Sequence, residues 1–437
     1  MKSIRYIFHI VAMLLVSEVI ICAQPQSESR DGFYKDIFMD SGVQLVPRKY
    51  LPSATHLQAD IETFWQTGNT LRDTVMQKRC FAGSDMDSNG ILMYPDGSPR
   101  FRIVYVNGGL ALFHGRSLGK SGQERFREYV NGGGSYLGTC AGGYIGTLGV
   151  YREDGTFSER SDYFALWPGR SRDTYLEEIE FTMYMDENSP LLKYYDFGGD
   201  MKIDNIYHCN GGYASLGEED PIPAGTEPLL RVDYNEPPKI GPCIDNQVCC
   251  WAYKPSESVG RVVLMSSHPE AVPSGERMHL MSALLQYAMD GNGAVAAKGE
   301  LIPGEVREMN KSTEDKDPLF TKIGDRQYHH FTVEIPKRTE EAVIVLQGYE
   351  GADNFDLTLA ACKDELAFHN KTSMKNVSLG CNKTLVLKKP KAGKWYISVF
   401  CETTVTPDTG DNGIIYTGRT DVLNGVPYKI KVECSTL

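Results

Sequence analysis

The chain carries the stretch Gly132-Gly-Gly-Ser-Tyr-Leu-Gly-Thr-Cys-Ala-Gly-Gly-Tyr144, in which a short strand-like segment runs directly into a cysteine flanked by small residues. A nucleophile on a tight strand-to-helix turn needs small neighbours, because the backbone there is crowded and the side chain is pushed out above the sheet. The amides and positive dipole end of the following helix favour the thiolate over the thiol. Cys140 is therefore the candidate nucleophile. The alternative is an inert thiol or half of a disulfide, the common fate of a cysteine in an exported protein.

A second informative stretch is Gly260-Arg-Val-Val-Leu-Met-Ser-Ser-His-Pro-Glu270, an apolar strand that ends in a histidine and a glutamate. His268 follows the strand directly, so we expect it at the same carboxyl edge of the sheet as Cys140. An imidazole there can keep the thiol ionised and pass a proton to a leaving amine. Glu270 can accept a hydrogen bond from the other ring nitrogen and fix its tautomer. The sequence thus predicts a Cys140-His268-Glu270 triad.

Around these two stretches, strand-like and helix-like segments alternate from about residue 30 to residue 290. Strands are expected at residues 35–40, 101–106, 135–138 and 260–265, and helices at 123–130 and 276–289. This alternation predicts an α/β fold, a three-layer αβα arrangement with a mostly parallel sheet. Ligands collect at the carboxyl edge of such sheets. Other residues that could line the cleft, or be ordinary loop residues, are His114, Arg116, His208 and the turn at 210–212.

The two quoted stretches together resemble the class I glutamine amidotransferase-like superfamily, and within it the branch similar to the N-terminal domain of biotin-protein ligase. The resemblance covers about residues 33 to 290. It implies that the loop at Gly108 and Gly109 supplies one oxyanion amide and that the backbone N–H of Ala141 supplies the other. The same assignment suits the chemistry, because a tetrahedral oxyanion needs preorganised donors.

The function expected from this site is a secreted cysteine hydrolase that cleaves amide or peptide bonds through a thioester acyl-enzyme. Its partner is a small-molecule amide or a peptide substrate, and the sequence predicts no cofactor. Two alternatives stay open. One is a binding protein that retains the fold without turnover, and the other is a glutaminase-like enzyme that releases ammonia. Labelling of Cys140 tests the first alternative, and an ammonia assay on glutamine tests the second.

Beyond residue 300 the pattern changes to short alternating runs separated by turn residues, which favours a small all-β sandwich. It resembles the prepeptidase C-terminal type through the segments 354–359, 393–399 and 428–432. The expected organisation is a signal peptide over residues 1–23, a catalytic domain over 24–300 and a sandwich domain over 301–437.

The N-terminus indicates export. Met1-Lys-Ser-Ile-Arg5 is a positive start, and residues 6–16 form an apolar stretch of the length used for secretion. In that oxidising environment we expect two disulfides among four cysteines, with the pairing open; these are Cys362, Cys381, Cys401 and Cys434. Four sequons suit glycosylated surface loops if the source is eukaryotic; they begin at Asn310, Asn370, Asn376 and Asn382.

The net charge of −12 excludes the usual nucleic-acid binding proteins, which neutralise phosphates with Lys and Arg. No segment beyond the N-terminal one is apolar enough to predict a membrane span. Cys209, Cys243, Cys249 and Cys250 lack convincing metal-ligand spacing, so no metal site is predicted.

Overall fold

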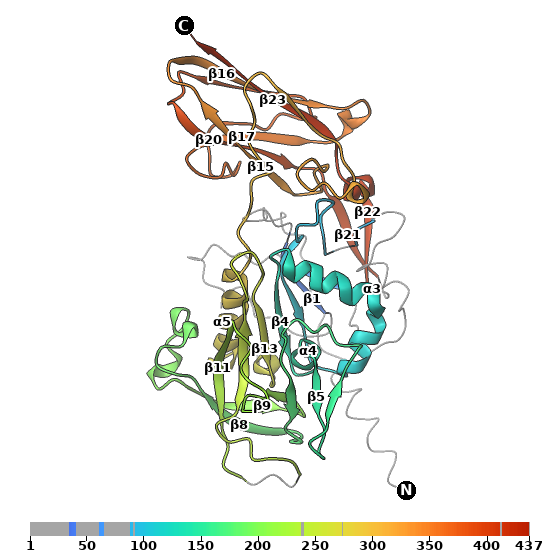
Figure 1. The fold of residues 1–437 in the computed structure, drawn as a ribbon, viewed down its shortest axis with the longest axis vertical. Helices are drawn as coiled ribbons and strands as arrows, with labels where there is room; N and C mark the ends of the chain where they lie inside the picture. The colour runs from blue at the N-terminus through green and yellow to red at the C-terminus, as the bar shows by residue number, and fades with distance from the viewer. Residues whose placement is uncertain are drawn as a thin grey trace.

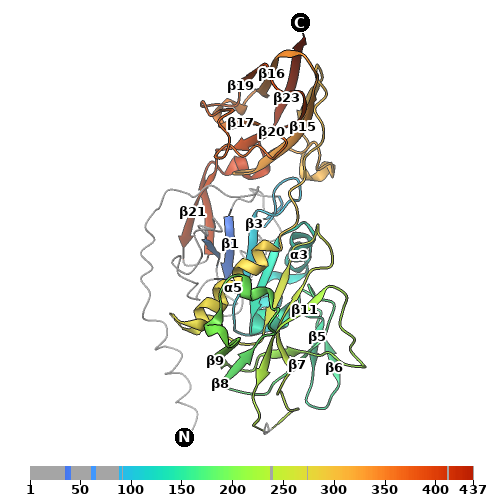
Figure 2. The same cartoon turned by 90° about the vertical axis from the view of Figure 1, so that its left-hand side faces the viewer.

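The computed structural model describes residues 35–40, 61–64, 88–90, 92–236, 240–272, 274–410 and 413–436. The expected signal peptide, residues 1–23, and Cys80 lie outside these described residues. Figures 1 and 2 show two lobes, one built around a large sheet with flanking helices and a C-terminal one made of strands. The backbone amide of Lys298 already donates to the carbonyl of His330, at 2.6 Å. We therefore call residues 298–436 the C-terminal lobe.

The large sheet has nine strands and is mixed. Their order is β2 (Ile61–Phe64), β1 (Lys35–Asp40), β3 (Phe101–Val106), β4 (Ser135–Thr139), β13 (Val262–Met265), β12 (Val248–Tyr253), β11 (Thr226–Asp233), β8 (Ile179–Tyr184) and β9 (Lys202–His208). The pairings from β2 to β13 are parallel, and those from β13 to β9 are antiparallel.

The prediction of a mostly parallel sheet was therefore wrong for one half of the sheet. Parallel neighbours need a long crossover, usually a helix, whereas antiparallel neighbours can be joined by short turns. Within the described residues, no α-helix lies between the end of α4 at Ile145 and the start of α5 at Glu276. The strands of that segment return through turns and loops, so they pair antiparallel.

The parallel half of the sheet has a helix against each face. On β3, Ile103 and Tyr105 face a core that includes α5 (Glu276–Asp290). The alternate residues Val104 and Val106 face a second core that includes α3 (Ala111–Asn131). This alternation is the period-2 pattern of a strand buried on both faces.

Helix α3 ends where the sequence predicts, at the glycines after Asn131, but it begins twelve residues earlier than expected, at Ala111 instead of Gln123. The early part contains Gly115 and Gly119, and Gly119 adopts a non-helical φ of 65° that kinks the helix. Two glycines lower the helix propensity of that segment, which is why the pattern did not reveal it. The strands β3 and β4 lie within one residue of their predicted bounds.

A smaller sheet lies beside this core and consists of β10 (Gly212–Ala214), β7 (Ser171–Asp173), β5 (Gly149–Tyr151) and β6 (Phe157–Glu159). Within the described ranges, the 3-10 helices are η4 (Pro190–Lys193), η5 (Phe197–Gly199), η6 (Pro269–Ala271), η7 (Thr313–Asp315), η8 (Ala352–Asn354) and η9 (Thr420–Asn424). Among the described residues, no helix combines the length and the apolar character needed to cross a bilayer.

In the C-terminal lobe two four-stranded sheets share one hydrophobic core. One contains β14 (Val306–Met309), β23 (Tyr428–Thr436), β16 (Thr339–Gly348) and β19 (Lys383–Lys388). The other contains β15 (Tyr328–Ile335), β20 (Gly393–Cys401), β17 (Leu357–Lys363) and β18 (Lys375–Asn376). A hairpin of β21 (Val405–Gly410) and β22 (Gly413–Gly418) extends toward the N-terminal lobe beside β1 and β2 (Figure 1). The resemblance of this lobe to the prepeptidase C-terminal type stays a prediction.

The expected disulfides are absent: no bond joins any two of the described cysteines. The Cys381 thiol instead donates to the carbonyls of Ala352 and Phe355, at 2.9 and 3.2 Å. Cys401 lies fully buried in the sandwich core, where burial raises the pKa of its thiol. Here cysteine acts as a small apolar side chain with a weak donor, a role that counting cysteines does not reveal.

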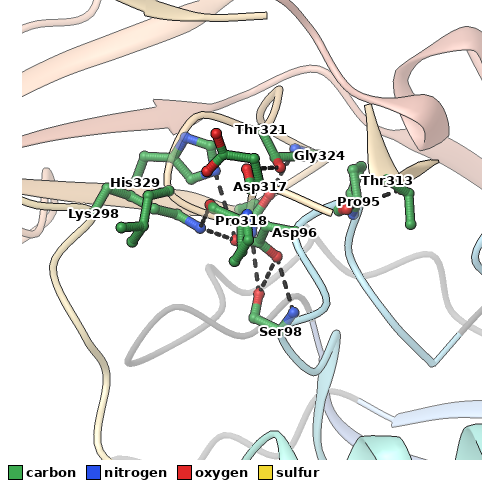
Figure 3. A network of polar contacts seen from close by, with 12 residues as sticks. Pro95, Asp96, Ser98, Lys298, Thr313, Asp317, Pro318, Thr321, Gly324 and His329 are labelled. Atoms are coloured by element: carbon green, nitrogen blue, oxygen red, sulfur yellow. Dashed lines mark hydrogen bonds and ion pairs between the residues drawn. The ribbon is translucent and has the colours of Figure 1, made fainter. Parts of the chain in front are cut away.

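A buried polar network joins the two lobes (Figure 3). Asp96 of the N-terminal lobe accepts hydrogen bonds from the Ser98 hydroxyl at 2.6 Å and from the Gln327 amide at 2.7 Å, and forms an ion pair with Lys298. Burial acts to raise the pKa of Asp96, but the charges of Lys298 and His329 and the hydrogen bonds from Lys298 and Ser98 lower it to about 2. A carboxylate can be kept ionised in an interior only by such partners.

Candidate active site

Cys140 stands in the sharp turn between β4 and the five-residue helix α4 (Ala141–Ile145). Its φ of 49° and ψ of −109° are rarely adopted by a residue with a side chain, and such strain is retained where surrounding structure over-determines it. The surroundings of Gly142 explain why the residues next to Cys140 are small. A Cβ at Gly142 would lie 2.0 Å from the carbonyl oxygen of Val106, at the end of β3. Because α4 has little more than one turn, its macrodipole is weaker than the sequence led us to expect.

His268 and Glu270 follow β13, the strand that pairs with β4 on the side away from β3. The backbone N–H of His268 donates to the carbonyl of Tyr207 at 2.9 Å, which anchors the turn to β9. The ring Nδ1 lies 2.8 Å from Oε1 of Glu270. The Glu270 side chain is 5% exposed and the His268 side chain 17%. The carboxylate is thus buried behind the ring, and the ring faces the surface.

The structure brings Cys140 into contact with the His268 ring. Burial lowers the pKa of His268, but hydrogen bonds to Cys140 and Glu270, together with their negative charges, outweigh it and raise the pKa to about 10. The Cys140 sulfur also lies 3.5 Å from the carbonyl oxygen of Cys209. The arrangement favours an imidazolium between a carboxylate and the sulfur, the charge distribution of an activated thiol nucleophile.

The loop at Gly108 and Gly109 lies beside the same site. The N–H of Gly142 donates to the carbonyl of Asn107 at 3.2 Å, which ties the loop to the cysteine turn. A Cβ at Gly108 would lie 2.3 Å from Cε1 of His268, so the ring packs directly on the backbone of this residue. Gly108 therefore has a packing role that the sequence did not indicate, beside the oxyanion role expected for Gly108, Gly109 and Ala141.

A second histidine behind the site is held neutral. Thr174 Oγ1 donates to the carbonyl of Gly211 at 2.9 Å, so it accepts from His208 Nε2 at 2.6 Å. His208 Nδ1 is then the acceptor for the Ser267 hydroxyl, at 2.8 Å. Burial and the nearby positive charge of His268 lower the pKa of His208 to about 3. His208 thus positions Ser267, the residue before His268, and does not act as a second base.

The turn at 210–212 packs beside the site, since a Cβ at Gly211 would lie 1.7 Å from the carbonyl oxygen of Ser266. Two other candidates from the sequence lie apart from this chemistry. His114 is fully buried in α3, and Arg116 forms an exposed ion pair with Asp162 at 3.1 Å. Tyr144 and Asp173 were missed; burial and the charges of Asp173 and Cys140 raise the pKa of Tyr144 well above its usual value. No local sequence pattern distinguishes Tyr144 and Asp173, because their distance from the candidate site depends on how the small sheet packs.

The described residues contain no group of three or more His, Cys, Asp or Glu side chains arranged to hold a metal ion. A cavity of about 370 Å³ lies between the lobes and is lined by Arg102, Met289 and Phe368 among others. Arg102 is near the start of β3, whereas the cysteine turn packs on the end of that strand. This cavity is thus separate from the candidate active site.

Comparison with known proteins adds a family. Residues 69–285 match the family model described as biotin-protein ligase, N terminal. No curated protein matches the chain significantly. Among solved structures, a glutamine amidotransferase is 14% identical and aligns over 43% of this chain and 80% of its own, with a TM-score of 0.30.

Two further solved structures align over more of the chain. A GMP synthase component from Thermoplasma acidophilum is 11% identical over 59% of this chain and 95% of its own, with a TM-score of 0.31. A ThuA-like protein from Bacteroides uniformis is 11% identical over 62% of this chain and 98% of its own, with a TM-score of 0.34. At these scores the likenesses carry no argument about function.

Proposed function

From the match of residues 69–285 to the biotin-protein ligase N-terminal family, we propose that the chain is a cysteine hydrolase of amide or peptide bonds, of the class I glutamine amidotransferase-like superfamily. The observation that carries the proposal is the row of Cys140, His268 and Glu270 at the ends of adjacent strands, with the sulfur on a strained turn. The signal peptide expected from the sequence makes it a secreted enzyme.

The proposed reaction has two halves. Cys140 attacks the carbonyl carbon of the amide, and the amides of Gly108 or Gly109 and of Ala141 stabilise the oxyanion. The His268 imidazolium donates its proton to the leaving amine as the C–N bond breaks, which leaves a thioester on Cys140. Neutral His268 then takes a proton from water as the water oxygen attacks the thioester carbon. The C–S bond breaks, which releases the acid and restores the Cys140 thiolate beside the His268 imidazolium. The sum is amide plus water giving acid plus amine.

Glu270 keeps its charge throughout this reaction. Its Oε1 holds Nδ1 of His268, so that Nε2 is the nitrogen that exchanges the proton with Cys140 and substrate. A carboxylate in this place stabilises the imidazolium that exists before the amine leaves. This role agrees with the raised pKa of His268.

The first test is alkylation of the intact protein with iodoacetamide between pH 5 and pH 9, followed by mass spectrometry. Cys243, an exposed cysteine of the same lobe, is the internal control. Although Cys140 is only 8% exposed, we expect it to react faster than Cys243 at pH 6. His268→Ala removes this advantage. A Cys140 that reacts no faster than Cys243 at any pH contradicts the proposal.

The second test is turnover. Peptidyl amides with a fluorescent leaving amine, and free glutamine with ammonia detection, are incubated with the wild type and with Cys140→Ala. Hydrolysis of a peptidyl amide that Cys140→Ala abolishes supports the proposal. Release of ammonia from glutamine alone supports the glutaminase alternative instead. Equal turnover by the wild type and Cys140→Ala contradicts the proposal, because it shows that Cys140 is not the nucleophile.

A further inference from the structure

Oε1 of Glu270 has a second hydrogen-bond partner. Thr139, the last residue of β4, donates its hydroxyl to this oxygen at 3.0 Å, while Nδ1 of His268 lies 2.8 Å from the same atom. Thr139 directly precedes Cys140 in the chain, so the strand that carries the nucleophile also holds the carboxylate. The Thr139 side chain is completely buried.

A third residue continues this chain of hydrogen bonds. The phenol of Tyr105, on the adjacent strand β3, lies 2.9 Å from the hydroxyl oxygen of Thr139. An ionised carboxylate can only accept, so the Thr139 proton points to Glu270 and the Tyr105 phenol must donate to Thr139. The direction is thus determined from Tyr105 through Thr139 to Glu270, and each donor polarises the next.

Glu270 has few other ways to be held. Its second oxygen, Oε2, is buried and has no hydrogen-bond partner among the described residues. A buried carboxylate needs hydrogen-bond donors to stay ionised and in place. Within the described part of the chain, the geometry therefore leaves Thr139 and His268 as its two holders.

We propose that Thr139, supported by Tyr105, is the positioning residue of the triad and holds the Glu270 carboxylate in the orientation that bonds the His268 ring. This inference rests on the proposed function, since it concerns how the same site is activated. Thr139 touches neither substrate nor sulfur in this role. It acts through Glu270, which in turn orients the ring that faces Cys140.

The test measures the site without needing a substrate: the rate of Cys140 alkylation by iodoacetamide as a function of pH. The titratable groups around the ring, besides its own partner Glu270, are Cys140 and, from β9 and the residue after it, Tyr207, His208 and Cys209. They are unchanged in three variants of this network, Thr139→Val, Thr139→Ser and Tyr105→Phe. Valine keeps the shape of threonine without the hydroxyl, and serine keeps the hydroxyl.

We expect Thr139→Val to lower the alkylation rate at pH 6 by about tenfold and to move the rise in reactivity to higher pH, since a hydrogen bond to a charged group is worth about that factor. Thr139→Ser restores the wild-type profile, and Tyr105→Phe gives an intermediate one. A purely structural role changes the melting temperature and leaves the pH profile as in the wild type. That result in Thr139→Val overturns the inference.

The outcomes separate the two proposals. A wild-type Cys140 with no advantage over Cys243 overturns the proposed function and this inference with it. A reactive wild type whose profile is unchanged in Thr139→Val overturns this inference alone. If Thr139→Val does not fold, Tyr105→Phe decides, because a profile identical to the wild type in that variant removes the hydrogen-bond chain as a cause of activation.

Discussion

The imidazole ring of His268 rests on the backbone of Gly108, so closely that a Cβ at Gly108 would stand 2.3 Å from Cε1 of the ring. The ring is thus contacted by a residue that follows a different strand, β3. Gly108 does not adopt a left-handed backbone conformation. A glycine is required there because the ring lies too close to the backbone to leave room for a Cβ. This contact and the hydrogen bond to Glu270 together hold the ring in its position.

The first prediction follows from that contact. Gly108→Ala displaces the His268 ring, because relieving such an overlap costs roughly 1–3 kcal/mol. We expect Cys140 alkylation at pH 6 and amide turnover to fall by about tenfold or more, with a small change in melting temperature. Gly217→Ala is the control, since no atom lies within 4 Å of a Cβ there. Equal activity of both variants would show that the ring is not held by this contact.

The second prediction orders the triad variants. His268→Ala removes the proton donor for the amine, so kcat falls by roughly 10²–10⁴, the usual contribution of general acid-base catalysis. Glu270→Gln costs less, because a glutamine oxygen can still accept from Thr139 and His268 while the charge is lost. Glu218→Gln, at an exposed position, leaves kcat unchanged. A Glu270→Gln loss larger than that of His268→Ala contradicts the assigned roles.

A third prediction concerns alkaline pH. The pKa of His268 is raised to about 10, so the imidazolium is present at neutral pH and is lost as the pH rises through that value. We expect kcat/KM to decline as the pH rises through the same value. In Glu270→Gln we expect this decline to occur at lower pH. Because the folded pKa lies above the unfolded one, the associated stability is complete below about pH 6.5 and lost on the way to pH 10. Activity that keeps rising beyond pH 10 would refute this assignment.

The fourth prediction concerns the contact between the lobes. The depressed pKa of Asp96 stabilises the protein above about pH 4, the ordinary range of a carboxyl group, and this contribution is lost as the pH falls through about 2. Asp96→Asn leaves the half-buried Lys298 without its carboxylate, and we expect a loss of roughly 1–3 kcal/mol at pH 7. Denaturant unfolding checks it, with Glu350→Gln as an exposed control. The difference from the wild type shrinks toward pH 2; a constant difference would exclude the ion pair as its cause.

The fifth prediction concerns the boundary. Limited proteolysis is expected to cut first within residues 291–305, where the segment from Ile302 to Glu305 is exposed. The two fragments stay together, because Gln327 still donates to Asp96 at 2.7 Å and Thr313 to the Pro95 carbonyl at 2.9 Å. Size-exclusion chromatography under native conditions checks this. A first cut outside residues 291–305 would count against the boundary.

Local patterns predicted much of the fold. The strands β3 and β4, the end of α3 and the helix α5 were readable because the signals are short-range: apolar runs, helical periodicity and glycines that end elements. In the C-terminal lobe, the strands β17, β20 and β23 overlap the segments 354–359, 393–399 and 428–432, with bounds that differ by a few residues. The antiparallel half of the large sheet was not predicted. The sequence pattern of a strand does not reveal which strand it pairs with, or whether the two run parallel or antiparallel.

For the candidate site, the sequence by itself determined the chemical groups and their order along the chain: a cysteine after one strand, then a histidine and a glutamate after another. Only the tertiary structure decided that Thr139 and Tyr105 line up behind Glu270 and that Gly108 supports the ring. The physical reason is that these contacts join residues far apart in the chain. They depend on the register in which β3, β4 and β13 pair, which the whole fold sets and no local pattern records.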